Sequence, residues 1–361
     1  MSFLIYYVIL LLGEFMNYLD KLDDKKINYF KILESEFPLW LVDYINTDAM
    51  LKQQYISMTC GTIYSDLFDT DYFFSSLDHS IGVALIVWHF THDKKQTLSG
   101  LFHDIATPVF KHCIDFMNGD YLTQESTEDL TTKIISGSSE IMNLLERDNI
   151  SIDDVDDYHK YSIADNDTPK LSADRLEYSL SNGSLTYNLL TMDDVERIYN
   201  DLSVQKNEDN IDELSFNTKK IAREFVKVTS KLSVIYRDDR TRYSMQFLAD
   251  IIKRMSIERL ISKDDLYNLK ELEVIELIEK SKYKVLYEKW KKAKKVKSSN
   301  QKIFGVYSVC ISAKVRYINP LVSGKRITDI CKIASKMIDK NLSYDMSNYI
   351  YIDGIDFELY E

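Results

Sequence analysis

Four side chains in the first half of the chain have the types and the order expected of a metal site. They are His79, the adjacent pair His103 and Asp104, and Asp174. Two imidazoles and two carboxylates form a mixed nitrogen and oxygen donor set, which suits a borderline or hard divalent cation such as manganese, iron, magnesium, nickel or zinc. Because such an ion lowers the pKa of a bound water from about 15.7 towards 7, the set predicts a hydrolase in which Asp104 is both ligand and catalytic residue.

The first of these residues lies on a predicted buried helix. The sequence around His79 stays apolar as far as Trp88, and Gly82, Val83 and Ile86 recur at helical spacing on the face that carries the histidine. An imidazole on such a face needs a polar partner. We expect Gly82 to let another part of the backbone approach this helix closely.

The adjacent pair lies near the end of a second apolar helical stretch, which Pro108 should terminate. An aspartate next to a histidine among Leu101, Phe102 and other apolar side chains is costly to bury unless a cation or a donor neutralises it. A metal ion would satisfy both residues of the pair.

The fourth ligand opens a third predicted helix. Ser172 precedes Asp174 as an N-cap, and the Asn182-Gly183 pair follows as a stop. Asp174 and Tyr178 then share one face, a single turn apart. Three separate helices are therefore each predicted to bury an ionisable group.

In their order and spacing these segments resemble the HD superfamily of metal-dependent phosphohydrolases. That family has a histidine, a His-Asp pair on a following helix and a distant aspartate on a later one. The local sequence around His79, Gly82, Asp174 and Tyr178 is most similar to that of the deoxynucleoside triphosphate triphosphohydrolase branch. The resemblance covers residues 70–185 and implies a helical HD core holding one divalent metal ion.

The resemblance also implies roles around the metal. His112, nine residues after His103, matches a second histidine of that branch and is the candidate for proton transfer. Glu125 is the alternative catalytic carboxylate, together with Glu128. The predicted substrate-binding residues are Lys111, Arg175, Tyr178 and Asn182. Lys111 and Arg175 could hold phosphate oxygens, although solvated salt bridges are the commoner fate of such residues.

Two positions depart from the family pattern. Ser76 stands three residues before the first ligand, where the branch usually has an arginine. Thr107 stands three residues after the His-Asp pair, where many relatives carry a catalytic histidine or glutamate. The metal ligands therefore match the pattern, whereas the residues for phosphates and protons do not map cleanly.

Other candidates have simpler explanations. His89, His92 and His159 are predicted to be satisfied core histidines, because a lone histidine on an apolar face is seldom a ligand. The aspartates of segment 153–157 are predicted to form a solvated loop.

Composition predicts the fold class. The chain has 361 residues, 45% of them apolar, with only four prolines and ten glycines, so we expect a mainly α protein with a substantial core. We divide it into an N-terminal helical segment (1–48, with a helix interrupted at Pro38), an HD-type core (49–205), a helical extension (206–300) and a small α+β region (301–361). Helices are expected at 211–228, 245–261 and 327–338, and strands at 303–318 and 349–352.

Location is predicted from the cysteines and the N-terminus. The four cysteines are widely spaced without a CxxC pair, which favours a reducing cytoplasm. The ten apolar residues of segment 3–12 are too few to span a bilayer and follow no basic residue. Either Met16 is the natural start, or this run packs on the body or on a second subunit; we expect a homo-oligomer and no membrane contact.

A net charge of −12 makes the whole chain a poor match for nucleic acid. Segment 282–297 is an exception, with eight lysines interleaved with Tyr283, Tyr287 and Trp290. It could stack on bases, or be a solvated helix with its aromatic side chains inward. A second basic cluster, Arg237, Arg240 and Arg242, could reach the active site and replace the missing arginine.

Three function classes follow. The leading one is a metal-dependent phosphohydrolase acting on a nucleotide, with a dNTP as the first substrate to test. The second is a phosphodiesterase or nuclease on short or cyclic oligonucleotides. The third is a non-catalytic nucleotide-binding sensor, which Ser76 and Thr107 would allow.

Overall fold

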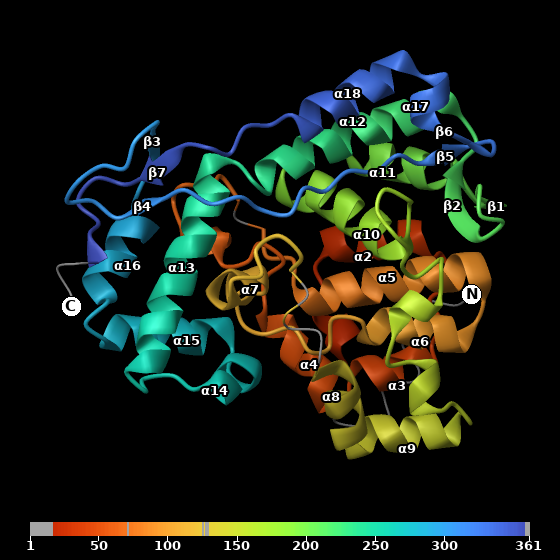
Figure 1. The fold of residues 1–361 in the computed structure, drawn as a ribbon. Coiled ribbons are helices and arrows are strands. Elements are labelled where there is room, and N and C mark those ends of the chain that lie inside the picture. The colour runs from red at the N-terminus through yellow and green to blue at the C-terminus, as the bar shows by residue number, and fades with distance from the viewer. Residues whose placement is uncertain (1–16, 71, 125, 127–129, 358–361) are drawn as a thin grey trace.

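The computed structural model describes residues 17–70, 72–124, 126 and 130–357, and it confirms the predicted fold class of a mainly helical protein with small sheets (Figure 1). The expected apolar run at 3–12 lies outside these residues. None of the helices in the described ranges combines the length and the apolarity needed to span a bilayer. The buried apolar side chains form two clusters, which we call the first and the second core.

The first core surrounds α5 (Ser76–Thr91), whose first twelve residues are all buried. Ser75 caps this helix in a capping box with Asp78, and His92 ends it in the left-handed conformation. A helix that is apolar on all sides belongs inside a larger body. It packs directly against α2 (Asp24–Leu33), α6 (Lys94–Phe102) and α10 (Ala173–Ser181). The first core also contains side chains of α3 (Leu41–Ile45), α4 (Asp48–Leu51), α8 (Thr131–Gly137), α9 (Ser139–Arg147), α11 (Met192–Tyr199) and α12 (Lys219–Ile235).

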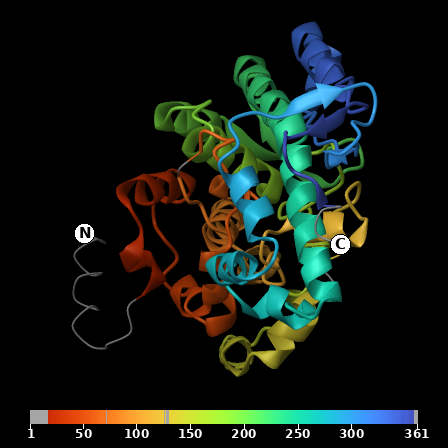
Figure 2. The ribbon, with the colours of Figure 1, turned by 90° about the vertical axis from the view of Figure 1, so that its left-hand side faces the viewer.

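The second core is built around α13 (Asp239–Ile257), which packs against α7 (His112–Asn118). It also contains α14 (Lys263–Asn268), α15 (Glu271–Lys280) and α16 (Lys284–Lys291). A three-stranded antiparallel sheet closes it, in the order β3 (Lys297–Ser299), β7 (Tyr349–Tyr351), β4 (Ser308–Val309). Figure 2 shows α13 as a long helix that continues downward from the end of α12.

A second sheet lies beside the first core. Its order is β1 (Leu202–Lys206), β2 (Asp212–Phe216), β5 (Leu321–Val322), β6 (Lys325–Arg326), and only the β2–β5 pair is parallel. After β6, α17 (Ile327–Ile330) leads into α18 (Lys332–Leu342), which packs on α12. The extended segment from β4 to β5 therefore runs from one sheet to the other across the molecule (Figure 1).

Two expectations about elements were wrong in part. The helix expected at 211–228 begins only at Lys219, because residues 212–216 pair in a hairpin with β1. Glu213 on that strand is fully buried and accepts hydrogen bonds from Arg326 and Leu171, and this pairing fixes the strand. The strands expected over 303–318 shrink to Ser308–Val309, while the helix at 327–338 and the strand near 349–352 are confirmed. The division into four parts stays a prediction.

Candidate active site

The rotation of α5, and with it the position of His79, is fixed at the start of the helix. Asp78, which precedes His79, is fully buried and accepts hydrogen bonds from the Tyr18 hydroxyl at 2.8 Å and from the Ser75 backbone N–H at 2.8 Å. The Lys26 ammonium neutralises it at 2.7 Å. This network leaves His79 on the face of α5 that looks toward α10.

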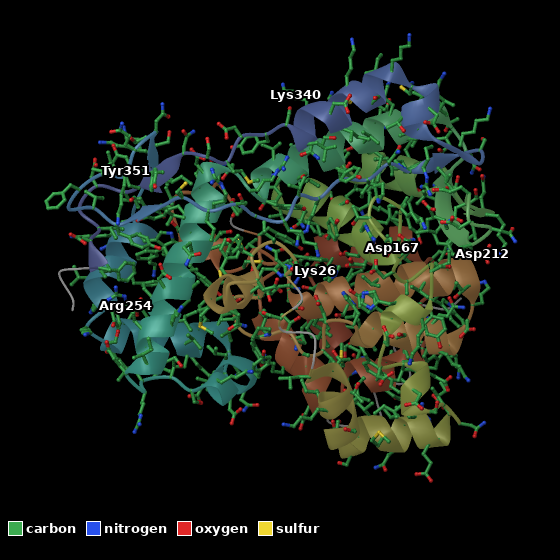
Figure 3. The ribbon with its side chains drawn as sticks, viewed as in Figure 1. Lys26, Asp167, Asp212, Arg254, Lys340 and Tyr351 are labelled. Atoms are coloured by element: carbon green, nitrogen blue, oxygen red, sulfur yellow. The ribbon has the colours of Figure 1, made fainter. Side chains whose placement is uncertain are left out.

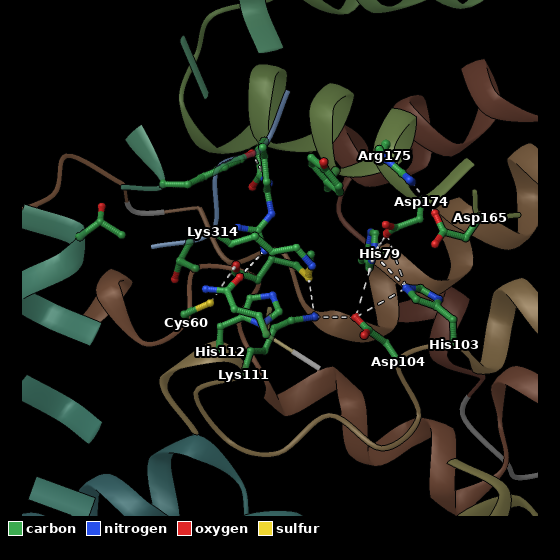
Figure 4. A pocket seen from close by; sticks show the side chains of 18 of the residues that line it. Cys60, His79, His103, Asp104, Lys111, His112, Asp165, Asp174, Arg175 and Lys314 are labelled. Atoms are coloured by element: carbon green, nitrogen blue, oxygen red, sulfur yellow. Dashed lines mark hydrogen bonds and ion pairs between the residues drawn. The ribbon is translucent and has the colours of Figure 1, made fainter. Parts of the chain in front are cut away.

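His103 and Asp104 follow directly after α6 and meet His79 side by side (Figure 4). The Nε2 atoms of His79 and His103 are 3.1 Å apart, and Asp104 Oδ2 lies 4.0 Å and 3.7 Å from them. Asp104 is half-buried. These three residues have the ligand spacing of a metal site, and no other such group occurs within the described ranges.

Asp174 approaches the same two imidazoles from the first turn of α10. Ser172 caps this helix as predicted, accepting from the Arg175 backbone N–H. Asp174 Oδ1 lies 3.1 Å from His79 Nε2 and 3.7 Å from His103 Nε2. The structure therefore brings together all four of the predicted metal ligands, from three separate helical segments.

The donors fit a divalent cation. His103 Nδ1 lies 2.7 Å from the Gly100 carbonyl oxygen, and His79 Nδ1 lies against the buried carboxylate of Glu177. Since Nδ1 must donate in both contacts, the two Nε2 atoms present lone pairs to each other, an arrangement that a proton or a metal ion between them would relieve. Two nitrogens flanked by two carboxylates match a borderline or hard ion.

The charges around this point favour a cation. Burial lowers the pKa of His79, but the carboxylates of Glu177 and Asp174 outweigh it and raise the pKa to about 10. Burial raises the pKa of Asp174, but the two imidazoles bring it to about 2. In the metal-free protein His79 therefore holds a proton, which a metal ion must displace on binding.

Gly82 has a function that the sequence only partly indicated. A Cβ atom there would lie 2.7 Å from Glu177 Cγ and 2.8 Å from Glu177 Oε1, so the glycine makes room for a side chain rather than for backbone. Glu177 cannot easily move, because its carboxylate also accepts from the hydroxyls of Tyr29 at 3.0 Å and Ser181 at 3.2 Å. Glu177, three residues after Asp174 on the same face of α10, is a site residue that we did not predict.

Replacing Gly82 by alanine is therefore expected to displace Glu177 and with it the His79 ring. Overpacking of a full core costs about 1–3 kcal/mol of unfolding free energy, and loss of an outer-shell partner of a ligand costs about 10–100-fold in metal affinity. Denaturant unfolding and a metal titration measure both effects. Gly137→Ala is the control, since a Cβ there meets nothing within 4 Å; equal behaviour of the two variants would contradict the prediction.

Lys111 binds a protein carboxylate. Its ammonium lies 2.5 Å from Asp104 Oδ2 and 3.4 Å from Ser76 Oγ. Burial raises the pKa of Asp104, but Lys111 and the two histidines hold it well below its usual range. Phe110 and Lys111 both have positive φ angles, 60° and 44°, so the chain is strained where it aims this lysine.

His112 lies on the pocket wall at the start of α7 (Figure 4). Its Nδ1 is 2.9 Å from Asp115 Oδ2, a fully buried carboxylate that also accepts from Ser126. Burial lowers the pKa of His112, the Asp115 bond opposes this, and the charges of Arg316 and Lys111 lower it further. Glu125 and Glu128, the alternative proton carriers, lie outside the described residues.

The other predicted substrate residues also face the pocket, with different partners. Arg175 is buried and bonded to Asp165 at 2.5 Å and to Ser172 at 3.0 Å. Tyr178 packs edge-on against Tyr236, and Asn182 donates to the Tyr236 hydroxyl at 2.9 Å. Thr107 is not among the residues that line the pocket; its carbonyl accepts from Lys52 at 3.0 Å.

The cavity itself measures about 230 Å³. Figure 4 shows the metal ligands on one side and Cys60, His112 and Lys314 on the other. Its wall includes residues that the sequence gave no reason to choose, from the C-terminal half and from loops near the first core. Among them are Gln124, Tyr158, His159, Tyr187, Tyr236, Lys314 and Arg316.

The prediction that His89, His92 and His159 are core histidines was wrong. His89 and His92 are exposed around the end of α5, and His89 pairs with Glu34 at 3.2 Å. His159 is more than half exposed, lies at the pocket and has its Nε2 3.6 Å from Asp165. An apolar neighbourhood in sequence does not bury a residue that stands at a helix end or in a loop. The aspartates of 153–157 do form an exposed or half-exposed turn, as expected.

The two basic clusters do not serve the site. Arg237 and Arg242 are fully buried and donate to main-chain carbonyls, including those of Asn341, Ile311 and Met346. Arg240 bonds to Asp238. None of these arginines lines the pocket, which corrects the expectation that they replace the missing arginine.

In the lysine-rich segment the aromatic side chains point inward. Tyr283, Tyr287 and Trp290 are at most 1% exposed, and the Trp290 indole donates to Ser244 at 3.0 Å. These rings are therefore unavailable for stacking on bases, and the alternative of a solvated helix with buried aromatics is confirmed.

Comparison with known proteins supports the fold. No protein-family model matches the chain. It is 23% identical over 207 residues to the uncharacterized protein YdhJ of Bacillus subtilis (strain 168), a match that covers 57% of this chain and 61% of that protein, about three-fifths of its length. Two solved structures resemble it. One is a hypothetical protein from Aquifex aeolicus, with a TM-score of 0.52 and 16% sequence identity, and the match covers 87% of this chain and 92% of that one. The other is a phosphohydrolase from Bacteroides thetaiotaomicron VPI-5482, with a TM-score of 0.51 and 12% sequence identity, and the match covers 86% of this chain and 94% of that one. The chain thus shares a mainly helical fold with these two proteins.

Proposed function

We propose that the protein is a metal-dependent phosphohydrolase of the HD type that hydrolyses a nucleotide, with a deoxynucleoside triphosphate as the first candidate substrate. The observation that carries the proposal is the convergence of His79, His103, Asp104 and Asp174 on one point at the edge of a cavity. The likeness to a phosphohydrolase fold supports it. When bound, a divalent ion would supply an acidified water and a positive charge beside the substrate phosphate.

The residues of the chain then have distinct tasks. Glu177 and the Gly100 carbonyl keep the ring tautomers that leave each Nε2 free to bind. Lys111 keeps Asp104 ionised. The tyrosines at positions 178, 187 and 236 and Asn182 line the cavity, where their rings offer aromatic surface for a base and their amide and hydroxyl groups can meet its polar edges.

Proton delivery to the leaving oxygen falls to His112. Since the pKa of His112 is lowered in the free protein, its imidazole is mostly neutral near pH 7. An anionic phosphate beside the ring would raise this pKa and favour the protonated form. Asp115 orients the ring and would stabilise the charged form.

Replacing His112 by alanine is expected to lower kcat by about 10²–10⁴-fold with metal saturating. The limb of the pH profile on which kcat falls as pH rises should disappear, because only the protonated imidazole can act as the acid. His92→Ala, at an exposed position, serves as the control. An unchanged kcat and pH profile would remove His112 from the mechanism.

A substrate panel tests the function itself. Purified protein with manganese, magnesium, iron, nickel or zinc would be incubated with mononucleotides, triphosphates, and cyclic and short oligonucleotides, and released phosphates and nucleosides measured. Turnover of triphosphates supports the proposal. Turnover that rises with oligonucleotide length would identify a phosphodiesterase or nuclease instead, and metal binding without any turnover would identify a sensor.

A further inference from the structure

Arg316 reaches the pocket from far along the chain. It belongs to the extended segment between β4 and β5, and its guanidinium donates to the Gln124 side-chain oxygen at 2.5 Å. The main chain around it is fixed at two points: Lys314 N–H donates to the Tyr121 carbonyl and Asn341 donates to the Arg316 carbonyl, both at 3.1 Å. These two hydrogen bonds hold the segment against the body of the protein, and Arg316 and Lys314 both line the cavity.

The positive charge of Arg316 affects the pKa values of several pocket residues. Burial raises the pKa of Tyr178 to about 12, while the nearby guanidinium of Arg316 acts in the opposite direction. The same guanidinium acts on Tyr236 and contributes to the lowered pKa of His112. Arg316 shares the cavity wall with His112 and with the tyrosines at 178 and 236.

The cations on the metal side of the pocket already have anionic partners. Lys111 is paired with Asp104, and Arg175 is paired with Asp165, each at 2.5 Å. Within the described ranges, Arg316 donates to a neutral amide oxygen, and this contact does not compensate its positive charge. A guanidinium presents a planar set of donors that matches a phosphate group in two-point contact.

We propose that Arg316 binds a phosphate group of the substrate on the side of the pocket where Lys314 lies, opposite the candidate metal ligands (Figure 4). The inference rests on the proposed function and deepens it: the substrate carries at least two anionic groups, one at the candidate metal ligands and one at Arg316. A phosphate chain has this chemistry. The C-terminal segment then completes the active site.

The test measures binding of inorganic tripolyphosphate to metal-free protein by calorimetry, because this probe needs no turnover. Arg316→Ala is expected to weaken binding by about tenfold or more, as for a lost charge-assisted hydrogen bond. Arg316→Lys should recover part of the loss. Lys340→Ala, on the outer surface of α18, is the charge-matched control and should bind as the wild type does (Figure 3).

A purely structural role for Arg316, as a tie for the loop at 121–124, predicts a different result. In that case Gln124→Ala would weaken binding as much as Arg316→Ala does, whereas our proposal expects Gln124→Ala to bind at least as tightly as the wild type. Failure of the wild type to bind tripolyphosphate, or unchanged binding by Arg316→Ala, would overturn the inference. Binding that depends on Arg316 in a protein that hydrolyses nothing would refute the proposed function and leave this inference standing.

Discussion

Replacing His103 by alanine is expected to remove the metal ion and to lower kcat/KM by about 10³-fold, since a metal ion contributes several kcal/mol to a hydrolytic transition state. The substitution is well suited to the test. His103 contributes Nε2 to the cluster, while its other nitrogen bonds only to the Gly100 carbonyl within its own helical segment. Its loss should therefore affect the metal site more than the core.

The measurement combines metal content after gel filtration with kinetics at saturating metal. His89→Ala is the matched control, because His89 is an exposed histidine whose ion pair with Glu34 lies at the surface. A surface pair of this kind contributes about 0–1 kcal/mol, so the control should keep both metal and activity. An alanine variant of His103 that retains one tightly held ion and wild-type turnover would refute the site.

The cluster of candidate metal ligands was predictable from the sequence for a physical reason. A histidine or a carboxylate within an apolar helix has to find a partner, so burial itself marks the position. His79, His103 and Asp174 satisfy this condition, and N-cap serines before two of the helices indicate where those helices begin. Glu177 was predictable by the same logic, as a carboxylate one turn after Asp174, but its role depends on which helix faces it.

The opposite wall of the pocket was not predictable, because it depends on long-range packing. Arg316 looks like any basic residue in an extended segment, and only the tertiary fold brings it to His112. Conversely, the compact cluster containing Arg237 and Arg242 had a suitable charge but occupies a place where chain segments present main-chain carbonyls. Local sequence shows that a charge is present, and the fold decides what that charge meets.

Glu271 shows how the C-terminal half holds the active-site turn. It is fully buried on the first turn of α15, and it accepts from the Tyr64 hydroxyl at 2.8 Å and from the Phe110 backbone N–H at 3.2 Å. Phe110 begins the strained pair that aims Lys111 at Asp104. Burial raises the pKa of Glu271 to about 7, although these bonds, a further one from the Ser57 backbone and the charge of Lys52 all oppose the rise.

Because this carboxyl has a higher pKa in the folded protein than its ordinary value of 4.5, the folded state binds more protons between about pH 4.5 and 7. Its contribution to stability is therefore fully present below pH 4.5 and is lost as pH rises through about 7. The difference of 2.5 pKa units corresponds to about 3 kcal/mol. Relative to the wild type, Glu271→Gln should gain about this much unfolding free energy between pH 4.5 and pH 8.

Denaturant unfolding at a series of pH values measures this gain, with Glu276→Gln as control, since Glu276 is an exposed member of an ion pair on the same helix. The control should follow the wild type within a few tenths of a kcal/mol. Parallel pH profiles for wild type and Glu271→Gln would show that Glu271 titrates normally.

We expect the same substitution to lower kcat by about tenfold or more. The glutamine cannot accept hydrogen bonds from all of the donors that hold the turn at Phe110 and Lys111, and a small displacement of catalytic groups is costly. On this expectation, the carboxylate that weakens the fold at neutral pH also positions the residues next to the candidate metal ligands.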